Sequence, residues 1–173
     1  QRELPFCIHT RYSTQQAILE DIVASLYAQG MRKLIILSGH GGNNFKGMIR
    51  DLAFVYPDFL IIAADWFSIV PPKDYFEAVV DDHAGESETS VMMHYHPELV
   101  NLDEAGDGES KPFAIPSLNE KVGWAPRHWD KATVDSGVGN PKKASAEKGE
   151  RYMKPVVEKL SKLFTEVGQG SLY

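Results

Sequence analysis

The sequence has only one cysteine, Cys7, among 173 residues, which excludes an internal disulfide and fits a reducing compartment. No run approaches the ~20 apolar residues that cross a bilayer, and we find no secretory h-region, so we expect a cytoplasmic protein without membrane contact. The net charge is −6 and the basic residues form no cluster, which argues against nucleic acid as a partner. Because Cys7 lies in a short apolar run, we expect a buried structural thiol.

Several catalytic signatures are also absent. The sequence has no nucleophile elbow, phosphate-binding loop, dinucleotide fingerprint or Cys-x-x-Cys pair. Nucleophilic Ser or Cys catalysis therefore has no support. The length suits one domain with a core of its own.

The first third of the chain predicts a helix followed by a strand–helix–strand unit. Ser13 is the expected N-cap of the first helix, Gly30 its C-cap, and Ile18, Ile22 and Leu26 its buried face. The apolar runs 33–37 and 60–64 lack polar alternation, which is typical of strands in a buried parallel sheet. A helix over 45–56, with Met48, Leu52 and Val55 on one face, joins them as a right-handed crossover.

The later part of the chain gives weaker patterns. We expect a strand or a short helix over 75–80, and a helix over 86–95 that ends before Pro97. Residues 101–141 form a long, irregular stretch typical of a lid or binding loop. The last helix is expected over 142–165, with Val156, Leu160 and Leu163 toward the core.

Residues 38–44, with the sequence SGHGGNN, place His40 in a glycine turn after the first strand. The carboxyl ends of parallel strands are where open α/β sheets bind ligands. The glycines keep bulk away from the imidazole, so a metal or a small substrate could approach it. A packing or capping role for His40 is equally compatible with this pattern.

Residues 82–90, with the sequence DHAGESETS, place His83 just before a helix and Glu86 in its first turn. Acidic residues there suit the helix dipole, but three acids and a histidine exceed what capping needs. The cluster could hold a divalent metal or supply an acid–base histidine oriented by a carboxylate.

The other histidines are weaker candidates. His94 and His96 are two residues apart on a helix, face different sides and are expected at the surface or in an interface. His128, next to Arg127 in the long loop, could contact substrate, although a solvated position is favoured. Asp65 at a strand end is a further weak candidate.

Together with residues 137–149, GVGNPKKASAEKG, these two motifs resemble the signature of the creatininase (creatinine amidohydrolase) family. The resemblance implies an α/β fold, a three-layer αβα sandwich with a mostly parallel sheet. It also implies a homo-oligomer, often a hexamer, with one or two divalent metals, zinc being favoured over manganese or iron. The implied reaction is hydrolysis of an amide or cyclic amide C–N bond in a small molecule by metal-activated water.

Carried over by motif, His40 is a metal ligand, His83 the proton-transfer histidine and Glu88 the carboxylate near it. In creatininase itself a glutamate two residues after the first histidine also binds metal. That position is Gly42 here, which points to Glu86 as the replacement ligand. Substrate contacts are expected from Asn43, Trp124 and Trp129, with Trp66 as a further candidate.

The family's first metal-binding segment, a Glu-x-His pair and a later Asp, has no counterpart in the sequence. Because the chain starts at Gln1 rather than Met, we expect a single domain over 1–173 that lacks an N-terminal portion of the family fold. The alternative is a non-catalytic binding or assembly protein with an incomplete metal site. A metal-independent sugar or nucleotide hydrolase would rest only on Asp82, Glu86 and Glu88.

Overall fold

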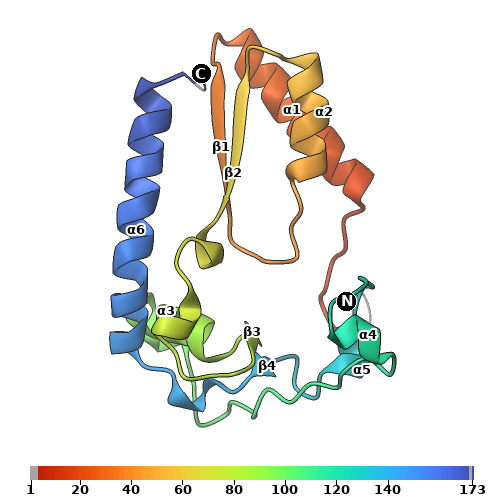
Figure 1. Cartoon of the computed structure of the whole chain (residues 1–173), viewed down its shortest axis with the longest axis vertical. Helices are drawn as coiled ribbons and strands as arrows, with labels where there is room; N and C mark the ends of the chain where they lie inside the picture. Colours follow the sequence, from red (N-terminus) through yellow and green to blue (C-terminus); the bar gives the residue numbers. More distant parts are fainter. Residues whose placement is uncertain (1–3, 172) are drawn as a thin grey trace. The chain divides into compact units, whose positions relative to one another are not determined.

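The computed structural model describes residues 4–171 and 173, coloured along the sequence in Figure 1. They form two compact units. Unit 1 comprises Pro71–Lys154 and the described residues up to His9, and unit 2 comprises Thr10–Val70 and the described residues from Pro155 onward. Gln1 lies outside the described residues, and the single domain expected from the sequence stays a prediction.

Unit 2 contains the predicted strand–helix–strand arrangement. Helix α1 (Tyr12–Ala28) leads to strand β1 (Lys33–Ser38), helix α2 (Lys46–Val55) and strand β2 (Leu60–Asp65), followed by the short helix η1 (Trp66–Ser68). β1 and β2 pair in parallel, with Lys33 opposite Leu60 and Ser38 opposite Asp65. Both turns after the strands therefore lie at the same edge of the sheet.

Helices α1 and α2 cover one face of this sheet. The buried core they form with the strands consists of Leu19, Val23, Met48, Leu52, Phe59 and Ile61.

The C-terminal part of the last helix, α6 (Ala146–Gln169), lies on the other side of β1 and β2 (Figure 1). The Lys33 ammonium donates to the carbonyls of Val167 and Gly170, both at 2.6 Å. A cation at a helix C-terminus complements the helix dipole there.

The predicted buried face of α1 is wrong by one residue. Ile18 and Ile22 are about half exposed, whereas Leu19 and Val23 are buried and Leu26 packs beside them. Two rows of apolar residues run along this helix at i, i+4 spacing, about 100° apart, so packing against the sheet selects between them.

The caps at both ends of α1 differ from the prediction. The N-cap is Arg11, not Ser13. The C-cap is Gln29 rather than Gly30, and Gly30 follows it with φ 85°, the left-handed conformation common just after a helix end.

Other expectations on apolar faces had mixed outcomes. Met48 and Leu52 are buried on α2, but Val55 is exposed at its end. On α6, Val156 and Leu160 are buried and Leu163 is half-buried. Cys7 is only half-buried, so the fully buried thiol expected from the sequence is not found.

Unit 1 is built around strand β3 (Asp81–His83) and helix α3 (Glu86–Tyr95), the latter with the bounds that the sequence predicts. β3 pairs antiparallel with β4 (Val138–Gly139). The other elements are short: η2 (Pro72–Asp74), η3 (Pro97–Leu99), α4 (Pro116–Asn119), α5 (Trp129–Ala132) and η4 (Pro141–Lys143). Residues 75–80 form neither the strand nor the helix expected there, and residues 101–141 are largely irregular as predicted.

Helix α6 begins four residues later than predicted because Ser145 caps it. The Ser145 hydroxyl accepts the Lys148 N–H at 3.2 Å, which satisfies a free donor of the first turn. The Ser145 N–H in turn donates to the hydroxyl of buried Ser90 on α3, at 3.1 Å. No helix of the described residues is both long and apolar enough to cross a membrane.

Gly149 allows α6 to lie directly against α3. A Cβ atom at this position would lie 2.1 Å from the Ser90 carbonyl oxygen, a distance that real Cβ atoms do not adopt. A side chain at position 149 would therefore force the two helices apart.

We expect Gly149→Ala to lower the free energy of unfolding by about 1–3 kcal/mol, the usual cost of overpacking. Gly168→Ala, on the same helix with no heavy atom within 4 Å of its Cβ position, is the matched control and should be neutral or stabilising by up to ~1 kcal/mol. Chemical denaturation of both variants measures this. Equal effects at the two positions would contradict the close contact.

Candidate active site

His83 lies at a sharp corner between β3 and α3. It is the last residue of β3 and pairs with Val138 of β4. Ala84, the next residue, has φ 48°, which turns the chain into the helix at Gly85. The imidazole is therefore carried by a short, hydrogen-bonded segment rather than by a free loop.

Two carboxylates around this corner accept backbone N–H groups. Asp81 accepts the Ser87 N–H at 3.2 Å, and Glu88 Oε2 accepts the Ala84 N–H at 2.7 Å. The Thr89 hydroxyl donates to the Ala84 carbonyl at 3.2 Å. These bonds satisfy backbone groups that a helix start and a tight turn leave without partners. Part of the acidic cluster therefore caps the start of α3, the local role that the helix dipole suggests.

The His83 ring is close to both Glu88 and Trp129. Its Nδ1 is 4.0 Å from Glu88 Oε2, and its ring meets the Trp129 ring edge-on, with centroids 5.3 Å apart and planes at 87°. Trp129 is buried, and its Nε1–H donates to the Ser136 carbonyl at 2.9 Å. A nearby carboxylate and a fixed indole restrict how the imidazole can turn, which is what an acid–base histidine needs.

Arg127 completes this cluster. Its guanidinium stacks over the Trp129 ring at 4.6 Å and pairs with Asp82 at 2.6 Å. Arg127 has no predicted role, and the only signal for it in the sequence is its position beside His128 and Trp129. Because Asp82 is engaged by Arg127 and Glu86 is buried, the structure gives no support to a hydrolase with paired carboxylates.

Glu86, the second metal ligand that the family resemblance implies, lies in the interior of unit 1. Its side chain is fully buried. One carboxylate oxygen accepts the N–H groups of Glu77 and Ala78 at 2.9 and 2.8 Å, and the other accepts the Lys148 ammonium. The hydrogen bond to Glu86 raises the pKa of Lys148, and the ammonium groups of Lys143 and Lys148 lower the pKa of Glu77.

His40 belongs to unit 2 and follows β1 in an exposed turn. Its Nδ1 accepts the Gly42 N–H at 2.9 Å, and its carbonyl accepts the Asn43 N–H at 3.1 Å. The Asn43 amide reaches the Ser38 hydroxyl at 3.5 Å, so Asn43 helps to shape the turn. The turn therefore holds the imidazole through its Nδ1 atom.

The tryptophans proposed as substrate contacts differ in their surroundings. Trp124 is 86% exposed, in contrast to buried Trp129. Trp66 begins η1 in unit 2, with its ring 6.0 Å from that of Phe67. Of the three, Trp129 is the one that the structure places against His83.

The structure also describes the weaker candidates. His96 is exposed and pairs with Glu98 at 3.1 Å, while His94 is half-buried against Tyr95. These two histidines lie toward the far end of α3. Asp65 ends β2 as predicted, and His128 is exposed.

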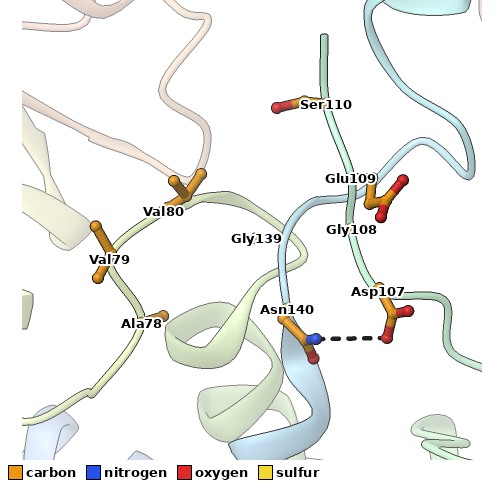
Figure 2. A pocket seen from close by; sticks show the side chains of 9 residues that line it. All are labelled: Ala78, Val79, Val80, Asp107, Gly108, Glu109, Ser110, Gly139 and Asn140. Atoms are coloured by element: carbon orange, nitrogen blue, oxygen red, sulfur yellow. Dashed lines mark hydrogen bonds between the residues drawn. The ribbon is translucent and has the colours of Figure 1, made fainter.

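The structure thus brings His83, Glu88 and Trp129 together in unit 1, whereas His40 and Asn43 are part of unit 2. Within residues 4–171 and 173, no group of three or more His, Cys, Asp or Glu side chains is arranged to hold a metal. A separate cavity of about 430 Å³ in unit 1 lies between residues 78–80 and 107–110, with Gly139 and Asn140 (Figure 2). Neither His83 nor Glu88 lines it.

Comparison with known proteins gives one consistent family. Residues 1–164 match the family model Creatininase, described as creatinine amidohydrolase. The chain is 33% identical over 131 residues to the mycofactocin precursor peptide peptidase of Mycobacterium ulcerans (strain Agy99), covering 73% of this chain and 45% of the relative. It is 24% identical over 169 residues to the creatinine amidohydrolase of Pseudomonas putida, covering 89% and 63%. The chain therefore spans about half the length of these curated relatives.

Solved structures agree on the fold. A protein of Bacteroides fragilis NCTC 9343, provisionally assigned as a creatinine amidohydrolase, is 83% identical with a TM-score of 0.97, covering 100% of this chain and 68% of that chain. Two creatininase structures, one named as a Zn-Zn type and one as Mn, have TM-scores of 0.74 and 0.73 at 22% and 21% identity, each covering 95% of this chain and 67% of the other. The α/β class with a parallel sheet is confirmed, in keeping with an αβα arrangement.

The geometry around His40 makes a test of the turn possible. A Cβ atom at Gly42 would lie 2.9 Å from His40 Nδ1, whereas one at Gly39 would have no heavy atom within 4 Å. We expect Gly42→Ala to displace the imidazole and to shift its ring resonances in NMR spectra of histidine-labelled protein. Gly39→Ala should leave them in place, and an unchanged His40 signal in Gly42→Ala would contradict the placement.

Proposed function

Because the chain belongs to the creatininase family, we propose that it is part of a metal-dependent hydrolase that cleaves a carbon–nitrogen bond in a small amide. The match to a family described as creatinine amidohydrolase, and the likeness to the creatinine amidohydrolase of Pseudomonas putida, support this proposal. The observation that supports a catalytic role most directly is the position of His83 at the β3–α3 corner, close to Glu88 and packed edge-on against Trp129.

In this proposal His83 moves the proton. The Glu88 carboxylate, 4.0 Å from Nδ1, orients the ring when the two side chains close to hydrogen-bonding distance. Nε2 then donates to the leaving nitrogen. Glu88 is itself fixed by the Ala84 N–H, so it acts from a defined position.

His40 is the proposed metal ligand of this chain. It is exposed, and glycines stand on both sides of it at positions 39, 41 and 42, which leaves room for an ion. An imidazole that binds metal through Nε2 carries its proton on Nδ1. Because Nδ1 now accepts the Gly42 N–H, this hydrogen bond would break when a metal binds at Nε2. A divalent metal would supply polarisation of the amide carbonyl and activation of water.

Zinc is the favoured metal, with manganese or iron as alternatives, and one or two ions are proposed. Among solved creatininases, one is named for zinc and another for manganese. A small amide is the proposed substrate, with Asn43, Trp124 and Trp129 as contacts. The proposal includes a homo-oligomer in the cytoplasm, with neither nucleic acid nor membrane as partner.

We expect His83→Ala to lower kcat for hydrolysis by about 10²–10⁴-fold, the usual contribution of acid–base catalysis, and Glu88→Gln by about 10–100-fold. The assay uses a panel of creatinine and short peptides, chosen from the names of the relatives. His96→Ala and Glu98→Gln are matched controls, because this pair is exposed at the other end of α3. Unchanged hydrolysis in His83→Ala would refute its role.

Elemental analysis of the purified chain tests the metal. We expect up to two equivalents of zinc, manganese or iron, and a loss of at least one in His40→Ala but not in His96→Ala. Absence of metal in the unaltered chain, even after incubation with excess zinc, would favour the non-catalytic binding protein instead.

A further inference from the structure

The Glu86 carboxylate is a charge in the interior of unit 1, and it is paired with Lys148. It accepts three donors: the N–H groups of Glu77 and Ala78 and the Lys148 ammonium. Lys148 also contacts Glu77 at 3.1 Å and the Lys143 carbonyl at 2.9 Å. A buried charge is tolerated only when it is paired and hydrogen-bonded in this way.

These contacts connect three segments that lie far apart in the sequence. Glu86 stands in the first turn of α3, Glu77 and Ala78 precede β3, and Lys148 lies in the first turn of α6. The close approach at Gly149 continues the same α3–α6 junction. The pair therefore fixes the start of α3 relative to the strand that ends at His83.

Glu88 differs from Glu86 in its exposure to solvent and in its distance from His83. Its side chain is 36% exposed and stands 4.0 Å from His83, whereas the Glu86 side chain is 0% exposed. A metal ion at Glu86 would have to displace the Lys148 ammonium and leave it without this partner, which is costly.

We propose that Glu86 and Lys148 form a positioning ion pair that holds His83 and Glu88 in place, and that Glu86 is not a metal ligand. The inference rests on the proposed function for its catalytic meaning. Its structural content, the placement of the His83 ring, can be measured without substrate or metal.

The first experiment uses the His83 ring as a position reporter in histidine-labelled protein. The indole of Trp129 shifts the ring resonance of His83 through its ring current, and Trp129→Leu gives the resonance without this shift. We expect Glu86→Gln and Lys148→Met each to move the His83 resonance toward the Trp129→Leu position. Lys143→Met, which removes only the outer partner of Glu77, should leave it unchanged.

The double variant, which combines Glu86→Gln with Lys148→Met, separates positioning from loss of folding. The amide oxygen introduced at position 86 still accepts the two N–H groups, and no ammonium is left without its partner. We expect the His83 resonance to return toward its original position. If the single variants lower the melting temperature but leave the resonance in place, the pair only stabilises the fold and the proposal is overturned.

The second experiment measures zinc per chain after incubation with zinc and removal of excess. The positioning role predicts that Glu86→Gln retains the zinc content of the unaltered chain, whereas His40→Ala loses it. Loss of zinc in Glu86→Gln with full retention in Lys148→Met would identify Glu86 as a ligand. A chain that binds no zinc at all would refute the proposed function but not the resonance result.

Discussion

The site depends on how the start of helix α3 is fixed. Its first turn carries carboxylates that point in different directions: Glu86 into the protein against Lys148, and Glu88 back over the corner toward His83. Both carboxylates accept hydrogen bonds from backbone N–H groups of residues that precede the helix. The orientation of the imidazole therefore depends on a helix start whose two glutamates are each held by hydrogen bonds, Glu86 also by Lys148.

The motif at residues 137–149 contributes to the same α3–α6 junction. Residues 137–149 supply β4, which pairs with the strand of His83, and then Ser145, Lys148 and Gly149 at the beginning of α6. These residues can support the site without contacting a substrate. Their common effect is that β3 and α3 are both held by one continuous stretch of chain.

Much of the fold could be predicted from the sequence because its signals are local. The apolar runs of β1 and β2 and the bounds of α3, which ends before Pro97, follow from neighbouring residues. The buried face of α1 could not be chosen, since Ile18 and Ile22 form a row as apolar as Leu19 and Val23. The start of α6 was placed too early because the residues before Ser145 form the separate short helix η4.

The site was predictable in its residue types but not in all their roles. His83 with Glu88 was identified by motif, and the structure places the two side by side. Glu86 and Glu88 look alike in the sequence. Only the contact with Lys148, 62 residues further along the chain, distinguishes Glu86 as the buried one. Trp124 and Trp129 likewise differ only through tertiary contacts, the first exposed and the second packed against His83.

The edge-on contact between His83 and Trp129 also gives the chain an optical property. A protonated imidazole close to an indole quenches its fluorescence, and the two ring centroids are 5.3 Å apart. Burial keeps bulk solvent from Trp129, so its emission responds mainly to its immediate neighbours. The fluorescence of Trp129 should therefore report on the charge of His83, the histidine proposed to move the proton.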